Sequence, residues 1–218
     1  MAIPGVSATT VDDNGVRITS LTVDDEHGSK AIGKMIGNYV TLEVPGLRKQ
    51  DTDLQNRVTT HFAKQFELFL KRIGLGENAK ALVVGLGNWN VTPDALGPIV
   101  VENVMITRHF FELMPNDVAP GYRPVSAVSP GVLGITGIES SDIIKGIVQQ
   151  SQPDFIVAID ALASKAIESQ YDDSDFRYRH SSGLRNWQQA ARYYRRNYGR
   201  PCHCSRCSNC HVCLDDCK

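Results

Sequence analysis

The sequence predicts an α/β fold built on a largely parallel sheet flanked by helices. Two short apolar runs, residues 81–84 (ALVV) and 155–159 (FIVAI), are typical of buried strands because each ends abruptly at glycine or a charged residue. Between them, apolar periodicity predicts helices over 98–113 and 141–150. A strand–helix–helix–strand order implies a crossover connection between parallel strands.

The amino-terminal part is predicted to hold two paired strands and one long helix. Residues 16–23 (VRITSLTV) and 39–44 (YVTLEV) are rich in β-branched residues in alternation, which is typical of half-exposed strands. Between residues 53 and 73 apolar side chains recur at spacings of three and four, so we expect an amphipathic helix that ends at the following glycines.

Local signals delimit the elements that follow. Pro98 opens the helix 98–113, where its missing N–H is no loss, and the proline-rich stretch 115–130 is predicted to be a loop. Three consecutive residues can each cap the helix 141–150 at its amino end: Ser140, Ser141 and Asp142.

Composition describes an ordinary globular chain with one sharp internal break. Its 218 residues carry a net charge of −1 and contain no apolar run of 18 residues, so no membrane partner is expected. The first ten residues lack the features of a secretory signal, which favours the cytoplasm. Residues 1–169 hold 14 Lys and Arg, 19 Asp and Glu and no cysteine, whereas residues 170–218 hold nine Lys and Arg, five Asp and Glu and all six cysteines.

Two aspartates follow the two apolar strands and form the candidate site. Asp94 lies on the loop after the strand 81–84, and Asp160 directly follows the strand 155–159. Open α/β sheets bind ligands at this edge. Each aspartate can equally be a helix cap or a turn residue, because aspartate favours both positions.

The loop before Asp94 reads GLGNWN. A dinucleotide fingerprint needs a third glycine where this chain has Asn90, so a nucleotide site is disfavoured. Backbone amides from Gly85 through Gly87 to Asn88 can instead hold a substrate carbonyl or an oxyanion. Trp89 is open to three interpretations: a wall of the site, a core residue or an interface residue.

Three strings carry a resemblance to a known family: GLGNWNVTPDALGP, RPVSAVSPGVLGITGIE and PDFIVAIDALAS. From about residue 3 to residue 168 the chain resembles the germination protease of spore-forming bacteria. The resemblance implies an endopeptidase that degrades small acid-soluble spore proteins during germination, with the two essential aspartates at Asp94 and Asp160. It also implies a zymogen, a homotetramer, a location in the cytoplasm of the spore core, and neither a nucleic-acid partner nor a required cofactor.

A carboxylate pair suits peptide hydrolysis. Because two close carboxylates do not both ionise easily, one holds a proton while the other takes a proton from the attacking water. The sequence leaves the two roles unassigned, and it leaves open a divalent metal bound by the carboxylates. The hydrogenase-maturation endopeptidases, which bind nickel, have a similar loop; the fold is therefore expected to resemble theirs, and they are an alternative identification. No histidine adjoins either aspartate in sequence, and His109 in mid-helix is more typical of a structural or surface residue.

Arg108 and Arg123 lie outside these motifs. Each can bind a carboxylate of the substrate, although an ordinary surface position is the simpler interpretation of both.

The last 17 residues contain overlapping C-x-x-C spacings with His203 and His211, which on spacing alone indicate a zinc site. A second interpretation explains more. Read one base later, permitted codons for residues 199–213 spell GVPVIAVGVPTV, and those for 170–183 spell NTTIQISDTGIHPG, both strings that resemble the germination protease. We therefore interpret residues 170–218 as sequence translated after a frameshift near Ser169.

The frameshift interpretation divides the chain into a partial α/β endopeptidase domain, residues 1–169, and a disordered tail rich in cysteine and arginine, residues 170–218. The family's propeptide and its C-terminal part are expected to be missing, so we expect the chain to be inactive. The alternative from another class is a zinc-stabilised nucleic-acid-binding protein with a basic tail.

Overall fold

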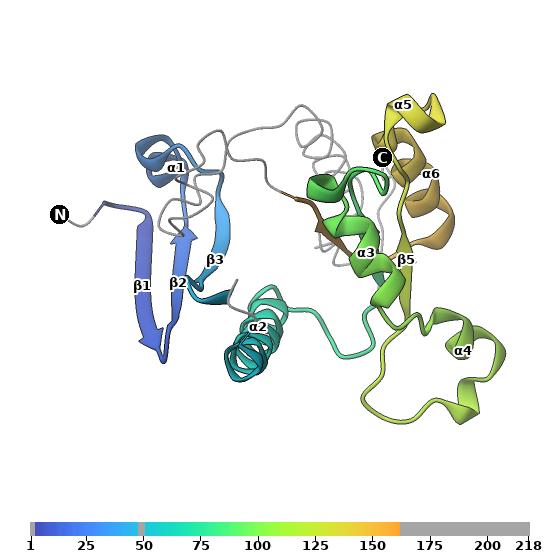
Figure 1. Cartoon of the computed structure of the whole chain (residues 1–218), viewed down its shortest axis with the longest axis horizontal. Helices are drawn as coiled ribbons and strands as arrows, with labels where there is room; N and C mark the ends of the chain where they lie inside the picture. Colours follow the sequence, from blue (N-terminus) through green and yellow to red (C-terminus); the bar gives the residue numbers. More distant parts are fainter. Residues whose placement is uncertain (1–2, 48–50, 162–218) are drawn as a thin grey trace, which may run out of the picture. The chain divides into compact units, whose positions relative to one another are not determined.

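The computed structural model describes residues 3–47 and 51–161 (Figure 1). These residues divide into two compact units, one up to Gly76 and the other from Glu77 onward. The predicted helix after Asp160, the frameshifted segment and the cysteine cluster lie outside the described residues, so the interpretations placed on them stay predictions.

The first unit contains a three-stranded antiparallel sheet in which the central strand is β2. Its strands are β1 (Val6–Asp13), β2 (Val16–Val23) and β3 (Gly37–Glu43). The two predicted strands are confirmed and paired, but β1 and the short helix α1 (Glu26–Ile32) were not predicted. Asp25 caps α1, because its carboxylate accepts a hydrogen bond from the Gly28 N–H at 2.7 Å.

The long amphipathic helix is confirmed as α2 (Thr52–Arg72). The Asp51 carboxylate caps it by accepting hydrogen bonds from the main-chain N–H groups of Asp53 and Leu54. One face of α2 packs on the antiparallel sheet, and the resulting core consists of Val16, Ile18, Val44 and Leu54 with the flanking Val40, Leu42 and Val58.

The second unit contains the predicted parallel sheet. Strand β4 (Ala81–Gly85) is central, and it pairs in parallel with β5 (Val125–Val128) on one side and with β6 (Phe155–Ile159) on the other. All five residues of β4 are buried. The prediction of a largely parallel sheet therefore holds for this unit, while the sheet of the first unit is antiparallel.

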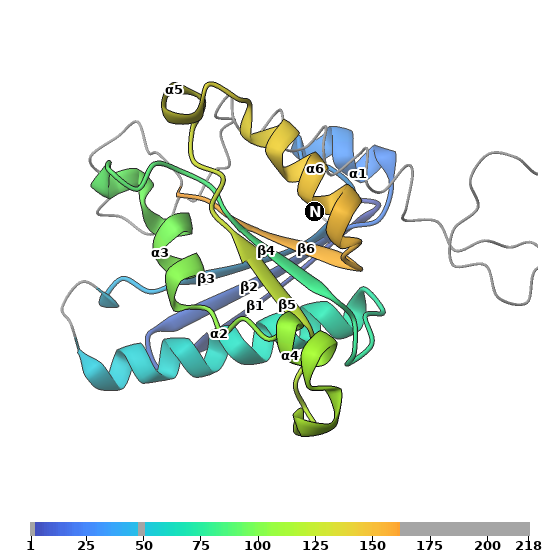
Figure 2. The same cartoon turned by 90° about the vertical axis from the view of Figure 1, so that its right-hand side faces the viewer.

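Helices cover both faces of the parallel sheet (Figures 1 and 2). Leu82 and Val84 point to one face, where they form a core with Ile144 and Val148 of α6 (Ser140–Ser151). Alternate residues of a strand point to opposite faces, so Gly85 faces the other helix, α3 (Leu96–Asn103).

The prediction of one helix over 98–113 is wrong, because the segment forms α3 and a separate helix α4 (Arg108–Leu113). Thr107 lies between the two helices and is only 6% exposed. The Thr107 N–H donates to the Val125 carbonyl, while its hydroxyl accepts from the Val125 N–H and donates to the Arg123 carbonyl. These long-range bonds end the helical path and attach the chain to the start of β5.

Two smaller predictions in this unit are also wrong. The stretch 115–130 is not all loop: it contains the 3₁₀ helix η3 (Pro115–Asp117) and strand β5, and the short helix α5 (Leu133–Thr136) follows it. The cap of α6 is Glu139, which makes no side-chain capping bond, and the Ser140 hydroxyl donates instead to the Gly131 carbonyl at 2.8 Å. Within the described part of the chain, no helix is both long and apolar enough to cross a membrane.

Candidate functional site

The candidate site lies where β4 and β6 end. Residues Gly85 and Ile159 are paired at the carboxyl ends of these two strands. The Leu86 N–H continues the pairing by donating to the Ile159 carbonyl at 2.8 Å. Asp160 therefore lies at the same edge of the sheet as the start of the loop that leads to Asp94, as the sequence predicted.

Three glycines make close backbone packing possible at this edge. A Cβ atom on Gly85 would lie 2.2 Å from the Gly97 carbonyl oxygen, and one on Gly97 would lie 2.2 Å from the Leu86 carbonyl oxygen and 2.7 Å from that of Ile159. The amino end of α3 is thus pressed against the ends of both strands. The sequence pattern did not single out Gly97, whose one signal was its place directly before Pro98.

Gly87 is the third of these glycines. Its φ of +119° is one that L side chains rarely adopt, and a Cβ atom there would lie 2.0 Å from the main-chain oxygen of Asp94. Glycine at this position therefore lets the loop fold back directly against Asp94.

Asp94 is the last residue of the 3₁₀ helix η2 (Thr92–Asp94). Its carboxylate accepts a hydrogen bond from the Asn88 N–H at 2.7 Å, and its own N–H donates to the Val91 carbonyl at 2.8 Å. The side chain is half-buried. It caps no helix, since α3 begins after Ala95 and has no side-chain capping bond, so the helix-cap interpretation is wrong for Asp94.

Asp160 is half-buried, and its proton affinity is shifted. Burial raises the pKa of Asp160, while a hydrogen bond from the Ala161 N–H acts to lower the pKa and the negative charge of Asp94 acts to raise it. The two aspartates are therefore close enough to interact electrostatically, and Asp160 binds its proton more tightly than an isolated aspartate does.

The loop amides are partly used within the protein. The N–H groups of Leu86 and Asn88 have acceptors, and the Asn90 N–H donates to the Asn88 side-chain oxygen at 2.9 Å. Trp89 is 47% exposed at the tip of this turn, so its interpretation as a core residue is wrong. Its position beside Asn88 and Asn90 leaves it next to the candidate site.

The remaining residues singled out in the sequence lie at the opposite edge of the sheet. Arg108 donates to Glu112 at 2.7 Å and to the carbonyl of Ser151 at 3.2 Å. The guanidinium carbon of Arg123 lies 5.6 Å from the ring centroid of Phe155, the first residue of β6. These contacts support a structural role for both arginines.

His109 belongs to α4, where its ring centroid lies 4.0 Å from that of Phe110. Over residues 3–47 and 51–161, no three side chains of His, Cys, Asp or Glu lie together in a way that could hold a metal ion.

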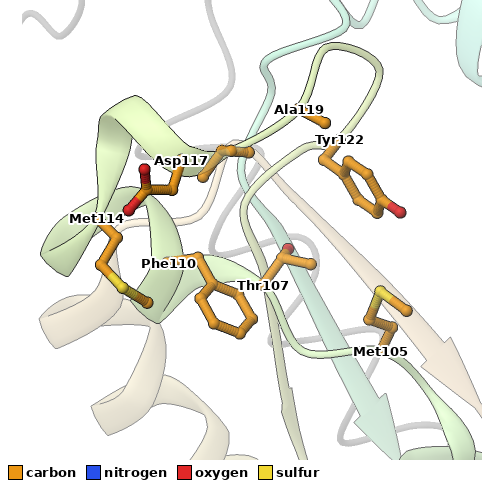
Figure 3. Close-up of a pocket in the computed structure, with 8 residues that line it drawn as sticks. Met105, Thr107, Phe110, Met114, Asp117, Ala119 and Tyr122 are labelled. Atoms are coloured by element: carbon orange, nitrogen blue, oxygen red, sulfur yellow. The ribbon is translucent and has the colours of Figure 1, made fainter.

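A cavity of about 290 Å³, whose lining Figure 3 shows, is lined by neither Asp94 nor Asp160. Its lining is largely apolar and includes Met105, Phe110, Met114 and Tyr122, together with Thr107. Thr107 is bonded to the first residue of β5, so the cavity adjoins the amino end of that strand. The candidate site, in contrast, lies at the carboxyl ends of β4 and β6.

Comparison with known proteins identifies the family. A family model described as germination protease matches residues 1–191. The chain belongs to the germination protease family. Curated germination proteases align with it over 166 residues: 59% of these residues are identical in the protein from Bacillus cytotoxicus, 57% in that from Bacillus cereus strain AH187 and 58% in that from Bacillus thuringiensis subsp. konkukian.

These alignments with germination proteases cover 76% of this chain but only 45% of each relative, so the chain spans less than half of their length. The aligned part is long enough to include the whole candidate site. The resemblance first seen in three sequence motifs is therefore confirmed at the level of the family.

The contact between Gly87 and Asp94 yields a stability prediction. We expect Gly87→Ala to lower the free energy of unfolding by at least about 2 kcal/mol, because the new methyl group meets main chain that cannot swing aside and the backbone keeps a strained φ. The matched control is Gly146→Ala in the middle of α6, where nothing lies within 4 Å. That change should stabilise the protein by about 0.5–1 kcal/mol. Urea denaturation measures both, and a Gly87→Ala variant as stable as the parent would contradict the packing described.

Proposed function

We propose that this chain carries the catalytic aspartate pair of an endopeptidase that hydrolyses small acid-soluble spore proteins. The observation that carries the proposal is the placement of Asp94 and Asp160 after two paired strands, β4 and β6, at one edge of the parallel sheet. Membership of the germination protease family supports the type of reaction.

The surroundings of the two aspartates favour different roles. Asp94 accepts a hydrogen bond from the Asn88 N–H, which orients its carboxylate. The raised pKa of Asp160 favours its protonated form. We therefore assign Asp94 as the base and Asp160 as the acid.

The proposed reaction follows an aspartic-type sequence. Asp94 removes a proton from a water molecule as the water oxygen attacks the carbonyl carbon of the peptide bond. Asp160 donates its proton to the carbonyl oxygen as the water attacks. Asp94 then passes the proton that it took from the water to the departing amine nitrogen. The C–N bond breaks as the carbonyl re-forms and returns a proton to Asp160. A metal-assisted version would use the same two carboxylates as ligands.

Further properties of the family complete the proposal. We propose that the working enzyme is a homotetramer made as a zymogen, that it acts in the cytoplasm of the spore core, and that its fold is related to that of the hydrogenase-maturation proteases. A three-stranded parallel sheet between helices supports the relation in fold.

We also propose that residues 170–218 are translated out of frame. The alignments with three germination proteases support this, since their 166 residues are close to the 169 that precede the proposed shift, although the family model matches as far as residue 191. The nucleotide sequence should contain a second open frame, one base on, that spells the family strings described above. Stop codons interrupting that frame would end the idea.

The catalytic assignment is tested in a protein whose frame is restored and continued to the length of the family. We expect Asp94→Asn and Asp160→Asn each to lower kcat/KM on a small acid-soluble spore protein by at least about 1,000-fold, because asparagine can serve neither as base nor as acid. Mass spectrometry of the cleavage products measures the rate.

The matched control is Asp154→Asn, at the other end of β6. The Asp154 carboxylate accepts a hydrogen bond from the Lys80 N–H at 2.7 Å, and an asparagine oxygen can accept the same bond. This variant should retain the parent activity. Cleavage that survives either Asp94→Asn or Asp160→Asn would refute the assignment.

A further inference from the structure

Asn88 joins the candidate base to the exposed tip of the loop. Its main-chain N–H donates to the Asp94 carboxylate at 2.7 Å, and its side-chain oxygen accepts a hydrogen bond from the Asn90 N–H at 2.9 Å. Its carbonyl accepts from the Val91 N–H at 3.1 Å. Three hydrogen bonds therefore fix both the backbone and the side chain of this residue.

The bond from Asn90 also fixes which way the side-chain amide faces. A main-chain N–H can only donate, so the atom that it contacts must be the oxygen of the Asn88 side chain, not its nitrogen. The nitrogen, with its two N–H groups, is on the other side of the amide. Among the described residues this nitrogen has no acceptor. It is nevertheless accessible to solvent, because Arg123 Nη1 is the one buried side-chain nitrogen or oxygen atom without a hydrogen-bond partner among those residues.

The main-chain amides of this loop are less available. The Asn88 N–H is used by Asp94, and the Leu86 N–H is used by Ile159. The Asn88 side-chain amide, in contrast, is held in one orientation by the bond from Asn90 and keeps its N–H groups free, on the residue that also bonds Asp94.

On the basis of the proposed function, we propose that Asn88 is a catalytic residue whose side-chain amide donates a hydrogen bond to the carbonyl oxygen of the scissile peptide. Negative charge develops on that oxygen as water attacks, and a donor fixed in advance stabilises the charge without reorganising. Asp94 acts on the water and Asn88 acts on the carbonyl. Their connection through a single hydrogen bond keeps the two in register.

The alternative role for Asn88 is purely structural, as the residue that closes the turn to Asn90. Two substitutions separate the roles. Asn88→Ser keeps an oxygen that can close the same turn, since serine forms the equivalent turn, but its hydroxyl is shorter than the amide. Asn88→Ala removes both the turn acceptor and the donor.

In the frame-restored protein we expect both variants to lower kcat by about 100- to 1,000-fold, the usual effect of removing one such donor, with KM changed by less than about threefold. Asn88→Ser should keep the melting temperature of the parent, and Asn56→Ser, at an exposed position on α2, should change neither kcat nor melting temperature. Asp94→Asn is measured in parallel.

The outcomes are distinguishable. If Asn88→Ser keeps the kcat of the parent while Asp94→Asn is inactive, Asn88 only closes the turn. The role proposed for Asn88 is then wrong, and the proposed function stands. If Asp94→Asn is active, or the frame-restored parent shows no proteolysis, the proposed function fails and the role of Asn88 fails with it.

Discussion

The arrangement of the site depends on the absence of a Cβ atom at three positions. Gly85 and Gly97 let the amino end of α3 approach the ends of β4 and β6, and Gly87 lets the loop fold against the main chain of Asp94. Each of these contacts would place a Cβ atom within 2.2 Å of a carbonyl oxygen, a distance that no side chain tolerates. Tight backbone packing, rather than a network of side chains, therefore positions the carboxylates.

This packing gives two chemically identical side chains different surroundings. Asp94 receives the Asn88 N–H, whereas Asp160 is shifted toward its protonated form first by burial and then by the charge of Asp94. A pair in which one member is ionised and the other protonated is what general acid–base hydrolysis requires. The same loop orients the Asn88 amide, so base, acid and carbonyl donor would all arise from the ends of two neighbouring strands.

Sequence patterns predicted the elements whose signals are local. Strands β4 and β6 are uninterrupted apolar runs, α2 and α6 have clear helical periodicity, and Asp94 and Asp160 follow strand ends that a parallel sheet brings together. The rest depended on contacts between distant residues. The break between α3 and α4 is set by bonds from Thr107 to β5, and the importance of Gly97 comes from its close fit against Leu86 and Ile159, at the ends of two strands. Strand β5 has only four residues, which is too short for a distinctive pattern.

The coupling of the two aspartates is the central claim, and a ¹³C NMR titration of the Asp160 side-chain carboxyl tests it most directly. In the parent chain its midpoint should lie above the ordinary aspartate range. In Asp94→Asn the midpoint should fall, because a neighbouring negative charge is removed, but it should stay above that range because burial is the larger cause. A midpoint in the ordinary range, or one that Asp94→Asn leaves unchanged, would contradict a shared site.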